Sequence, residues 1–172
     1  MRRGYVQIYT GSGKGKTTAA LGLALRAAGA GLKIFIAQFI KKKMCSEHRA
    51  LERFEDCITI KQYGKGLILN RPVTTSDIAA ARKGLEEPRD VMLSRDYDII
   101  ILDEANVAVK RGLISVDALL ELIKDKPTGL ELIITGRYAD ERVIEAADLV
   151  TEMKEIKHYG KKGVKARVGI EK

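Results

Sequence analysis

Apolar residues along this chain follow two different periods, and each period predicts one kind of element. Short runs rich in Ile, Val and Leu, bounded by glycine and polar residues, have the length and composition of β-strands. These runs predict strands over residues 5–9, 33–39, 58–62, 98–102, 131–134 and 149–152. Stretches with helical periodicity separate them, so we expect strands and helices to alternate along the chain.

Capping residues indicate where the helices begin and end. The first helix is predicted over residues 16–28, because the cluster Gly29-Ala30-Gly31 follows it and glycine readily adopts the left-handed conformation that ends a helix. Pro88 is predicted to end or kink the third helix. Four further N-caps are predicted, at Ser46, Ser76, Ser115 and Asp140.

Apolar strands flanked by helices on both sides are typical of a parallel sheet that is covered on both faces. We therefore predict a doubly wound α/β fold with a mainly parallel six-stranded sheet. A length of 172 residues with 45% hydrophobic and 31% charged residues fits one domain over residues 1–172. No apolar stretch reaches the length of a signal peptide or of a spanning helix, which favours a cytoplasmic protein.

The most informative motif lies between the first predicted strand and the first predicted helix, where residues 10–18 read TGSGKGKTT. Glycines allow successive backbone N–H groups to surround phosphate oxygens, and the helix N-terminus adds the positive end of its dipole. Lys16 is expected to reach the outer phosphates, and the Thr17 hydroxyl to coordinate Mg²⁺. The strict pattern G-x-x-x-x-G-K-[ST] requires glycine where Thr10 stands, so this loop is one residue short. We still predict a P-loop that binds nucleotide through Gly11, Ser12, Gly13, Lys14, Gly15, Lys16, Thr17 and Thr18.

A pair of acids follows the fourth predicted strand, where Ile99-Ile100-Ile101-Leu102 leads into Asp103 and Glu104. Open α/β sheets bind ligands at the carboxyl ends of their strands, so these carboxylates are expected to help hold the metal. Neighbouring residues on a strand point to opposite faces, which predicts that one acid faces the metal and the other acts through water or structure. Gln38 and Arg137 also follow strands and are expected to contact substrate.

The absence of certain sequence motifs disfavours several classes of enzyme and site. The chain has no Asn-Lys-x-Asp and no Asp-x-x-Gly after the acidic strand, which disfavours a GTPase. Its two histidines, His48 and His158, are the only candidate general bases near neutral pH, and isolated histidines are usually structural or solvated. Cys45 and Cys57 lack the spacing of a zinc site or a disulfide framework.

The net charge of +8 is concentrated at the two ends of the chain. Residues 1–43 contain nine Lys or Arg and no acid, and the basic tail, residues 154–172, contains seven bases against two acids. This distribution implies an anionic partner. Because aromatic residues make up only 5% of the chain, few side chains could stack on single strands, and a phosphate-rich small molecule explains the charge equally well.

Taken together, these motifs resemble the P-loop type of ATP:corrinoid adenosyltransferase, also called cob(I)alamin or cob(I)yrinic acid a,c-diamide adenosyltransferase. The short loop that begins at Gly11 looks like this family's own form. The resemblance covers nearly the whole chain and rests on residues 9–20, 38–41, 102–106, 135–137, 145–153, 157–158 and 169–171.

The resemblance implies transfer of the 5′-deoxyadenosyl group of ATP to Co(I) of a reduced corrinoid, with release of triphosphate, in adenosylcobalamin biosynthesis. Lys14, Lys16, Mg²⁺ at Thr17, Asp103 or Glu104, and the loop amides would stabilise the leaving triphosphate. It further implies a homodimer and a flavoprotein reductase that supplies Co(I).

One segment departs from the family pattern. Where the family often reads Gly-Phe-Thr-Trp, with aromatics against the corrin face, this chain reads Gly66-Leu67-Ile68-Leu69. Leu67 and Leu69 cannot stack, so contact with the corrinoid or displacement of its lower ligand is expected to differ, unless these leucines only pack in the core.

Two other functions stay open at this point. A nucleoside kinase of the thymidine-kinase type shares a P-loop and an Asp-Glu pair, although such kinases usually carry zinc-binding cysteines. A nucleic-acid-coupled ATPase would fit the positive charge. The product separates them: triphosphate, a nucleoside monophosphate, or ADP with phosphate.

Overall fold

The computed structural model describes residues 3–66 and 71–171 of the chain. Leu67 and Leu69, where the family resemblance expects aromatic side chains, lie outside the described residues. The described residues contain no helix with the length and apolar character needed to cross a membrane.

Six parallel strands form one sheet in the order β3-β2-β4-β5-β1-β6. The prediction of a six-stranded sheet is confirmed, and the predicted strand ends lie within one residue of the observed ones. The strands are β1 (Val6–Thr10), β2 (Ile34–Phe39), β3 (Ile58–Tyr63), β4 (Ile99–Asp103), β5 (Glu131–Thr135) and β6 (Leu149–Glu152).

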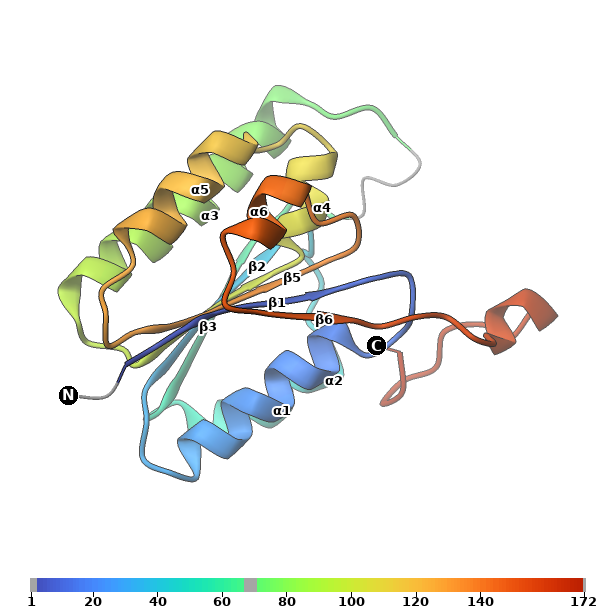
Figure 1. Ribbon diagram of the computed structural model, residues 1–172. Coiled ribbons are helices and arrows are strands. Elements are labelled where there is room, and N and C mark those ends of the chain that lie inside the picture. Colours follow the sequence, from blue (N-terminus) through green and yellow to red (C-terminus); the bar gives the residue numbers. More distant parts are fainter. Residues whose placement is uncertain (1–2, 67–70, 172) are drawn as a thin grey trace.

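Helices cover both faces of the sheet, as the doubly wound fold requires (Figure 1). On one face lie α1 (Lys16–Ala28) and α2 (Ser46–Leu51), followed by the short 3-10 helix η1 (Glu52–Phe54). The other face carries α3 (Thr75–Ser94), α4 (Ala105–Lys110), α5 (Val116–Asp125) and α6 (Glu141–Glu145).

Alternation along the central strands divides the core in two. Ile34 and Ile36 of β2 face α1, whose Ala20 and Ala24 are fully buried and let the helix approach closely. The intervening Phe35 faces the opposite side and belongs to the larger core. Because side chains alternate with period two, one buried strand supplies both cores, which explains why β2 is apolar on both faces from Ile34 to Ala37.

Two of the four predicted N-caps are wrong. The caps of α2 and α3 are Cys45 and Thr74, not Ser46 and Ser76, whereas Ser115 and Asp140 cap α5 and α6 as predicted. Thr74 is preferred because its side chain and that of Asp77 form a reciprocal capping box. Pro88 does not end α3, which continues through it to Ser94.

The chain beyond β6 leaves the sheet, forms the 3-10 helix η2 (Tyr159–Lys162) and returns toward the loop between β1 and α1 (Figure 1). Two contacts fix this return: Lys14 Nζ donates to the Ile170 carbonyl at 3.0 Å and to Glu171 Oε1 at 2.9 Å. The basic tail therefore contributes residues to the same edge of the sheet as the P-loop.

Candidate functional site

The candidate site lies at the carboxyl edge of the sheet, where β1, β2, β4 and β5 end side by side. The P-loop joins β1 to α1, Gln38 lies near the end of β2, Asp103 ends β4, and Arg137 follows β5. Parallel pairing brings these strand ends together although the P-loop and Arg137 are more than 100 positions apart in sequence. This is the placement predicted for ligands of an open α/β sheet.

Glycine at the start of the loop is required by a close neighbour. Gly11 has a φ of 95°, and a Cβ there would lie 2.5 Å from the Met153 carbonyl oxygen. The amide of Gly13 donates to the same oxygen at 2.6 Å. The P-loop is thus held against the strand end of β6, and the loop that lacks glycine at Thr10 still turns into α1 at Gly15, which has a φ of 118°.

Lys16 is folded back into the loop. Its Nζ donates to the carbonyl oxygens of Gly11 at 2.8 Å and Gly13 at 2.6 Å, and its side chain is 7% exposed. Burial lowers the pKa of Lys16 and nearby Arg137 lowers it further, while Glu104 and Asp103 oppose both. A phosphate group would supply the negative charge that this poorly solvated ammonium lacks.

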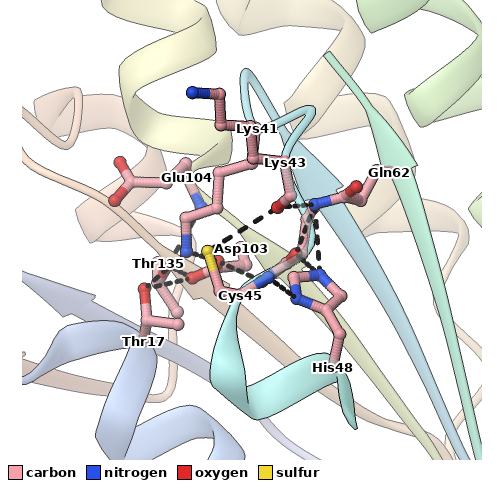
Figure 2. A network of polar contacts seen from close by, with 10 residues as sticks. Thr17, Lys41, Lys43, Cys45, His48, Gln62, Asp103, Glu104 and Thr135 are labelled. Carbon is pink, nitrogen blue, oxygen red and sulfur yellow. Dashed lines mark hydrogen bonds and ion pairs between the residues drawn. The ribbon is translucent and has the colours of Figure 1, made fainter. Parts of the chain in front are cut away.

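Asp103 accepts hydrogen bonds from four side chains and is 1% exposed. Its Oδ1 accepts hydrogen bonds from the hydroxyls of Thr17 at 2.8 Å and Thr135 at 2.7 Å. Its Oδ2 accepts from Gln38 Nε2 at 3.1 Å and Lys41 Nζ at 2.9 Å (Figure 2). These hydrogen bonds satisfy both oxygens of the buried carboxylate, and the bond to Thr17 fixes its hydroxyl at the start of α1.

Glu104 differs from its neighbour in both backbone and exposure. It has a φ of 63° as the N-cap of α4, its amide donates to Thr135 Oγ1 at 3.0 Å, and its carboxylate lines the cavity. Burial raises the pKa of Glu104 and the charge of Asp103 raises it further, whereas Lys41, Lys16 and Arg137 oppose the shift. The two acids therefore point to different places: Asp103 into the protein, and Glu104 into the cavity.

Lys41 adds a positive charge to the acid pair. Burial would lower the pKa of Lys41, but attraction to Asp103 and the hydrogen bond between them raise it above its usual value. Its Nζ also lies 3.5 Å from the Thr17 hydroxyl. The Lys41 ammonium therefore lies beside the hydrogen bond between Thr17 and Asp103.

Lys14 is held by the tail instead of by the loop. Its Nζ donates to the Tyr159 hydroxyl at 3.1 Å in addition to Glu171, and the pKa of Lys14 is raised by these hydrogen bonds, Glu171 first. Glu171 in turn accepts from Tyr159 and from the backbone and side chain of Arg167. This arrangement places a cation that the tail holds at the cavity lining.

A cavity of about 740 Å³ connects these parts, a volume in the range of small-molecule sites. Gln38 lies outside it, fully buried behind Asp103. Gly11 and Ser12 line a second hollow of about 520 Å³ on the other side of the loop, and Arg137 lines both. The sequence-predicted residues that line the main cavity are Gly13, Lys14, Gly15, Lys16, Thr17, Thr18, Glu104 and Arg137.

Sequence reasoning assigned no role to several residues that the structure brings to the site. Lys41, Thr135 and Glu171 were part of the quoted motifs, but no spacing rule indicated that they contact Asp103 or Lys14. A signal did exist for Lys41, because it follows a buried strand at the same sheet edge as Gln38. Tyr159 and Glu171 carried no such signal, since the return of the tail depends on tertiary contacts.

Comparison with known families gives one match over almost the full length. The family model described as ATP:corrinoid adenosyltransferase BtuR/CobO/CobP matches residues 2–171. The match includes the P-loop, the acid pair and the tail that holds Lys14.

Curated relatives show the same similarity. A corrinoid adenosyltransferase of Pseudomonas aeruginosa is 35% identical over 170 residues, which covers 98% of this chain and 84% of that protein. A corrinoid adenosyltransferase of Escherichia coli K12 is 32% identical over 169 residues, covering 98% and 86%. The corrinoid adenosyltransferase CobA of Salmonella typhimurium is 30% identical over 169 residues with the same coverage.

Proposed function

This chain belongs to the ATP:corrinoid adenosyltransferase family, and from that premise we propose that its P-loop cavity holds ATP for attack at the ribose instead of at a phosphate. The enzyme transfers the 5′-deoxyadenosyl group of ATP to the cobalt of a reduced corrinoid. The single observation that carries the assignment of this cavity is that Lys16, Thr17 and Glu104 line it together.

Adenosyl transfer from ATP to cobalt requires no proton transfer by a protein side chain. Co(I) donates an electron pair to C5′ of the ribose, the C5′–O bond breaks, and its electron pair leaves with triphosphate. The hard step belongs to the corrinoid substrate. This agrees with a cavity in which the one lining histidine, among the residues that the structure describes, is His158 of the tail.

The P-loop stabilises the leaving triphosphate electrostatically. Lys16 exchanges its carbonyl partners in the loop for phosphate oxygens, and the N-terminus of α1 adds its dipole. Lys14 reaches the phosphates from the rim when it leaves Glu171. Arg137, which lines the same cavity, contributes a further charge to substrate.

Thr17, Asp103 and Glu104 are the residues that would hold Mg²⁺. They fit the ion because they offer only hydroxyl and carboxylate oxygens, the ligands that Mg²⁺ prefers, and because Asp103 already orders the Thr17 hydroxyl. When bound, the ion neutralises charge on the phosphates. Glu104 supplies the carboxylate that faces the cavity, while Asp103 acts through Thr17.

The decisive experiment mixes the protein with Mg-ATP and chemically reduced cob(I)alamin in the absence of oxygen. We expect the light-sensitive adenosylcobalamin spectrum to appear together with an equal amount of triphosphate. Release of ADP without a corrinoid product would contradict the assignment and return attention to a kinase or a nucleic-acid-coupled ATPase.

We further propose a cytoplasmic homodimer that receives Co(I) corrinoid from a flavoprotein reductase. Family resemblance supports this proposal. Light scattering during gel filtration tests the dimer, which would be excluded by a mass near the 19.0 kDa of one chain. Reduction of Co(II) corrinoid by a flavoprotein, coupled to adenosylation only when both proteins are present, tests the reductase.

A further inference from the structure

His48 is buried behind the acid pair without touching it. This residue of α2 is 3% exposed, and the cavity lining includes its neighbours Ser46 and Glu47 but not His48 itself. Neither the reaction nor the family match assigns it a role. A buried polar ring needs partners for both nitrogens, and the identity of those partners shows what the ring can do.

The contacts of the ring determine which nitrogen carries the proton. The backbone N–H of Cys45 donates to Nδ1 of His48 at 2.9 Å, so Nδ1 carries no proton. The neutral ring therefore carries its proton on Nε2, which lies 2.7 Å from Oε1 of Gln38 and donates to it. Nε2 of Gln62 lies farther away, at 3.1 Å, and donates to the Lys43 carbonyl at 3.2 Å (Figure 2).

This hydrogen bond, at 2.7 Å, is the shorter of two that orient the Gln38 amide, because Gln62 Nε2 also donates to Oε1 of Gln38 at 3.4 Å. Because Oε1 accepts from His48, Nε2 of Gln38 must face the other way, where it donates to Oδ2 of Asp103 at 3.1 Å. If the amide turned over, Oε1 would face the carboxylate oxygen and two acceptors would meet in a buried place. The direction of donation therefore runs from the Cys45 amide through the ring and Gln38 to Asp103.

We propose that His48 is a positioning residue for this reaction: it orients Gln38 so that Asp103 keeps the donor that holds its carboxylate toward Thr17. The inference rests on the proposed function only in that Asp103 and Thr17 serve Mg-ATP. Partners behind a metal-binding group commonly change metal affinity when they are replaced, although they do not touch the ion.

A metal-binding role for His48 fits the contacts less well. Ligand atoms of Cys45, Glu47 and His48 lie within 4.8 Å of one another. Both ring nitrogens are already used, however, one as acceptor from Cys45 and one as donor to Gln38. A metal ion here would have to break one of these buried hydrogen bonds.

Two substitutions of His48 separate orientation of Gln38 from capping of α2. In His48→Gln, the terminal amide nitrogen can replace Nε2 as donor to Gln38, while the acceptor for the Cys45 amide is lost. In His48→Asn, the shorter side chain can replace Nδ1 as acceptor for Cys45, but it no longer reaches Gln38. Each variant loses one of the two hydrogen bonds and keeps the buried position polar.

The variants are compared by calorimetric titration of ATP at several Mg²⁺ concentrations, without corrinoid, and by the KM for Mg-ATP and kcat in the transfer assay. We expect His48→Asn to weaken Mg²⁺-dependent ATP binding by about tenfold and to raise KM more than it lowers kcat. His48→Gln should stay within about twofold of the unchanged protein, because the donor to Gln38 is kept. Equal losses in both variants, or a larger loss in His48→Gln, would overturn the proposal.

A spectroscopic measurement tests the proton position without ATP or metal. Long-range ¹H–¹⁵N correlation spectra distinguish a protonated ring nitrogen from an unprotonated one, and the chain has only two histidines, so a His158→Gln variant assigns the signals. We expect the neutral ring of His48 to carry its proton on Nε2. A proton on Nδ1 would refute the argument even if the enzyme adenosylates corrinoid, whereas failure of adenosylation with the expected tautomer and Mg²⁺ dependence would refute the proposed function alone.

Discussion

At the scale of single residues, hydrogen bonds within the protein hold two cations of the candidate site. Lys16 is bonded to loop carbonyls, and Lys14 is bonded to Glu171 and Tyr159. Lys41 is a third cation, but it faces Asp103 directly. The hydrogen bonds of Lys16 and Lys14 can be exchanged for phosphate oxygens without leaving a buried carboxylate unpaired, so these two are best suited to follow the charge of the leaving group.

Replacement of Lys16 should show how much its positive charge contributes to the reaction. We expect Lys16→Ala to lower the rate of adenosyl transfer by at least about 100-fold, because a preorganised charge facing the leaving triphosphate is lost. The initial rate of triphosphate release measures the effect. Lys110→Ala is a suitable control, since Lys110 lies at the end of α4 and does not line the cavity. Full activity of Lys16→Ala would refute the assignment of the P-loop.

Residue identities at this site were partly accessible from the sequence. The P-loop residues were predicted from the spacing of their motif, and the acid pair from its position after a buried strand. The structure brings Lys16, Thr17 and Glu104 to one cavity. His48 was interpreted as structural or solvated, and it is buried, but its link to Gln38 depends on the position of α2 over β2 and could not be read from spacing. The contact of Tyr159 with Glu171 is a tertiary contact of the same kind.

At the scale of elements, the start of α3 carries a cap whose strength depends on pH. Asp77 accepts two hydrogen bonds from the Arg71 guanidinium, both at 2.7 Å, and others from the hydroxyl and amide of Thr74. These contacts, Arg71 first, hold the pKa of Asp77 well below its usual range. Since the pKa is lower in the folded than in the unfolded state, the stabilisation is present above the ordinary carboxyl pKa of about 4 and is lost as the pH falls below it.

The variant Asp77→Asn tests this cap. We expect it to lower the free energy of unfolding by about 1 to 2 kcal/mol at pH 7, because a charged cap is removed. The difference from the unchanged protein should shrink at pH 3 in urea titrations followed by circular dichroism. Asp117→Asn is the control: Asp117 lies in the first turn of α5 and pairs with Arg142 at the exposed surface, so a change below about 0.5 kcal/mol is expected. A pH-independent loss would contradict the role of the Asp77 charge.

Two helical glycines should respond to alanine in opposite directions. A Cβ on Gly84 of α3 would lie 2.7 Å from Cβ of Tyr63, so Gly84→Ala should destabilise the protein by about 1 to 3 kcal/mol. A Cβ on Gly22 of α1 meets nothing within 4 Å, and Gly22→Ala should stabilise by about 0.5 to 1 kcal/mol. Denaturant midpoints measure both. Equal changes in the free energy of unfolding would show that helix propensity, and not the close packing of β3 against α3, determines the effect of alanine.

Strands were predicted well because apolar residues dominate them. Helix ends were predicted less well because neighbouring residues are alternative caps. All six strands were found because their apolar runs are short and bounded by turn residues. The caps of α2 and α3 were missed because serine is a preferred N-cap residue, so Ser46 and Ser76 were chosen from residue type alone. The structure places the helix starts one and two residues earlier, which makes Cys45 and Thr74 the caps. Pro88 was expected to end or kink α3, yet packing on the sheet carries the helix through it to Ser94.

At the scale of the whole molecule, the tail closes one wall of the site. The carboxylate of Glu171 gathers Lys14, Tyr159 and Arg167, and these hydrogen bonds, Arg167 first, hold the pKa of Glu171 well below its usual range. A single charged hub therefore joins the last described residue to the P-loop, although more than 150 positions of sequence separate them.

Loss of this hub should free the tail. In Glu171→Gln we expect trypsin to cut the basic tail several times faster than in the unchanged protein. The Lys and Arg residues that the structure describes in the tail are already exposed, but the backbone must unfold locally to enter the protease, and this opening becomes more frequent once the anchor is neutral. Mass spectrometry of timed digests identifies the cut sites. Glu155→Gln, which removes only a surface pair with Lys161, should change the rate little. Equal cleavage of all three proteins would show that Glu171 does not anchor the tail.

The fold class could be predicted from the sequence, but the order of the strands in the sheet could not. Alternating strands and helices predicted the parallel six-stranded sheet. The strand order, with β1 between β5 and β6, could not be predicted because each of these apolar strands would pair with any other, and only the three-dimensional packing of the connections selects the neighbours. The return of the tail to Lys14 could not be predicted for the same reason, because it depends on tertiary contacts.

The position of the two chain ends has a practical consequence for handling the protein. Figure 1 shows the amino-terminal end at one edge of the sheet and the carboxyl-terminal end beside the P-loop at the other. Glu171 lines the main cavity, whereas Arg3 and Tyr5 line a separate hollow at the opposite edge. A dye attached near Glu171 would therefore sense the arrival of nucleotide, and a protein immobilised through its amino-terminal end would present the open cavity to solution.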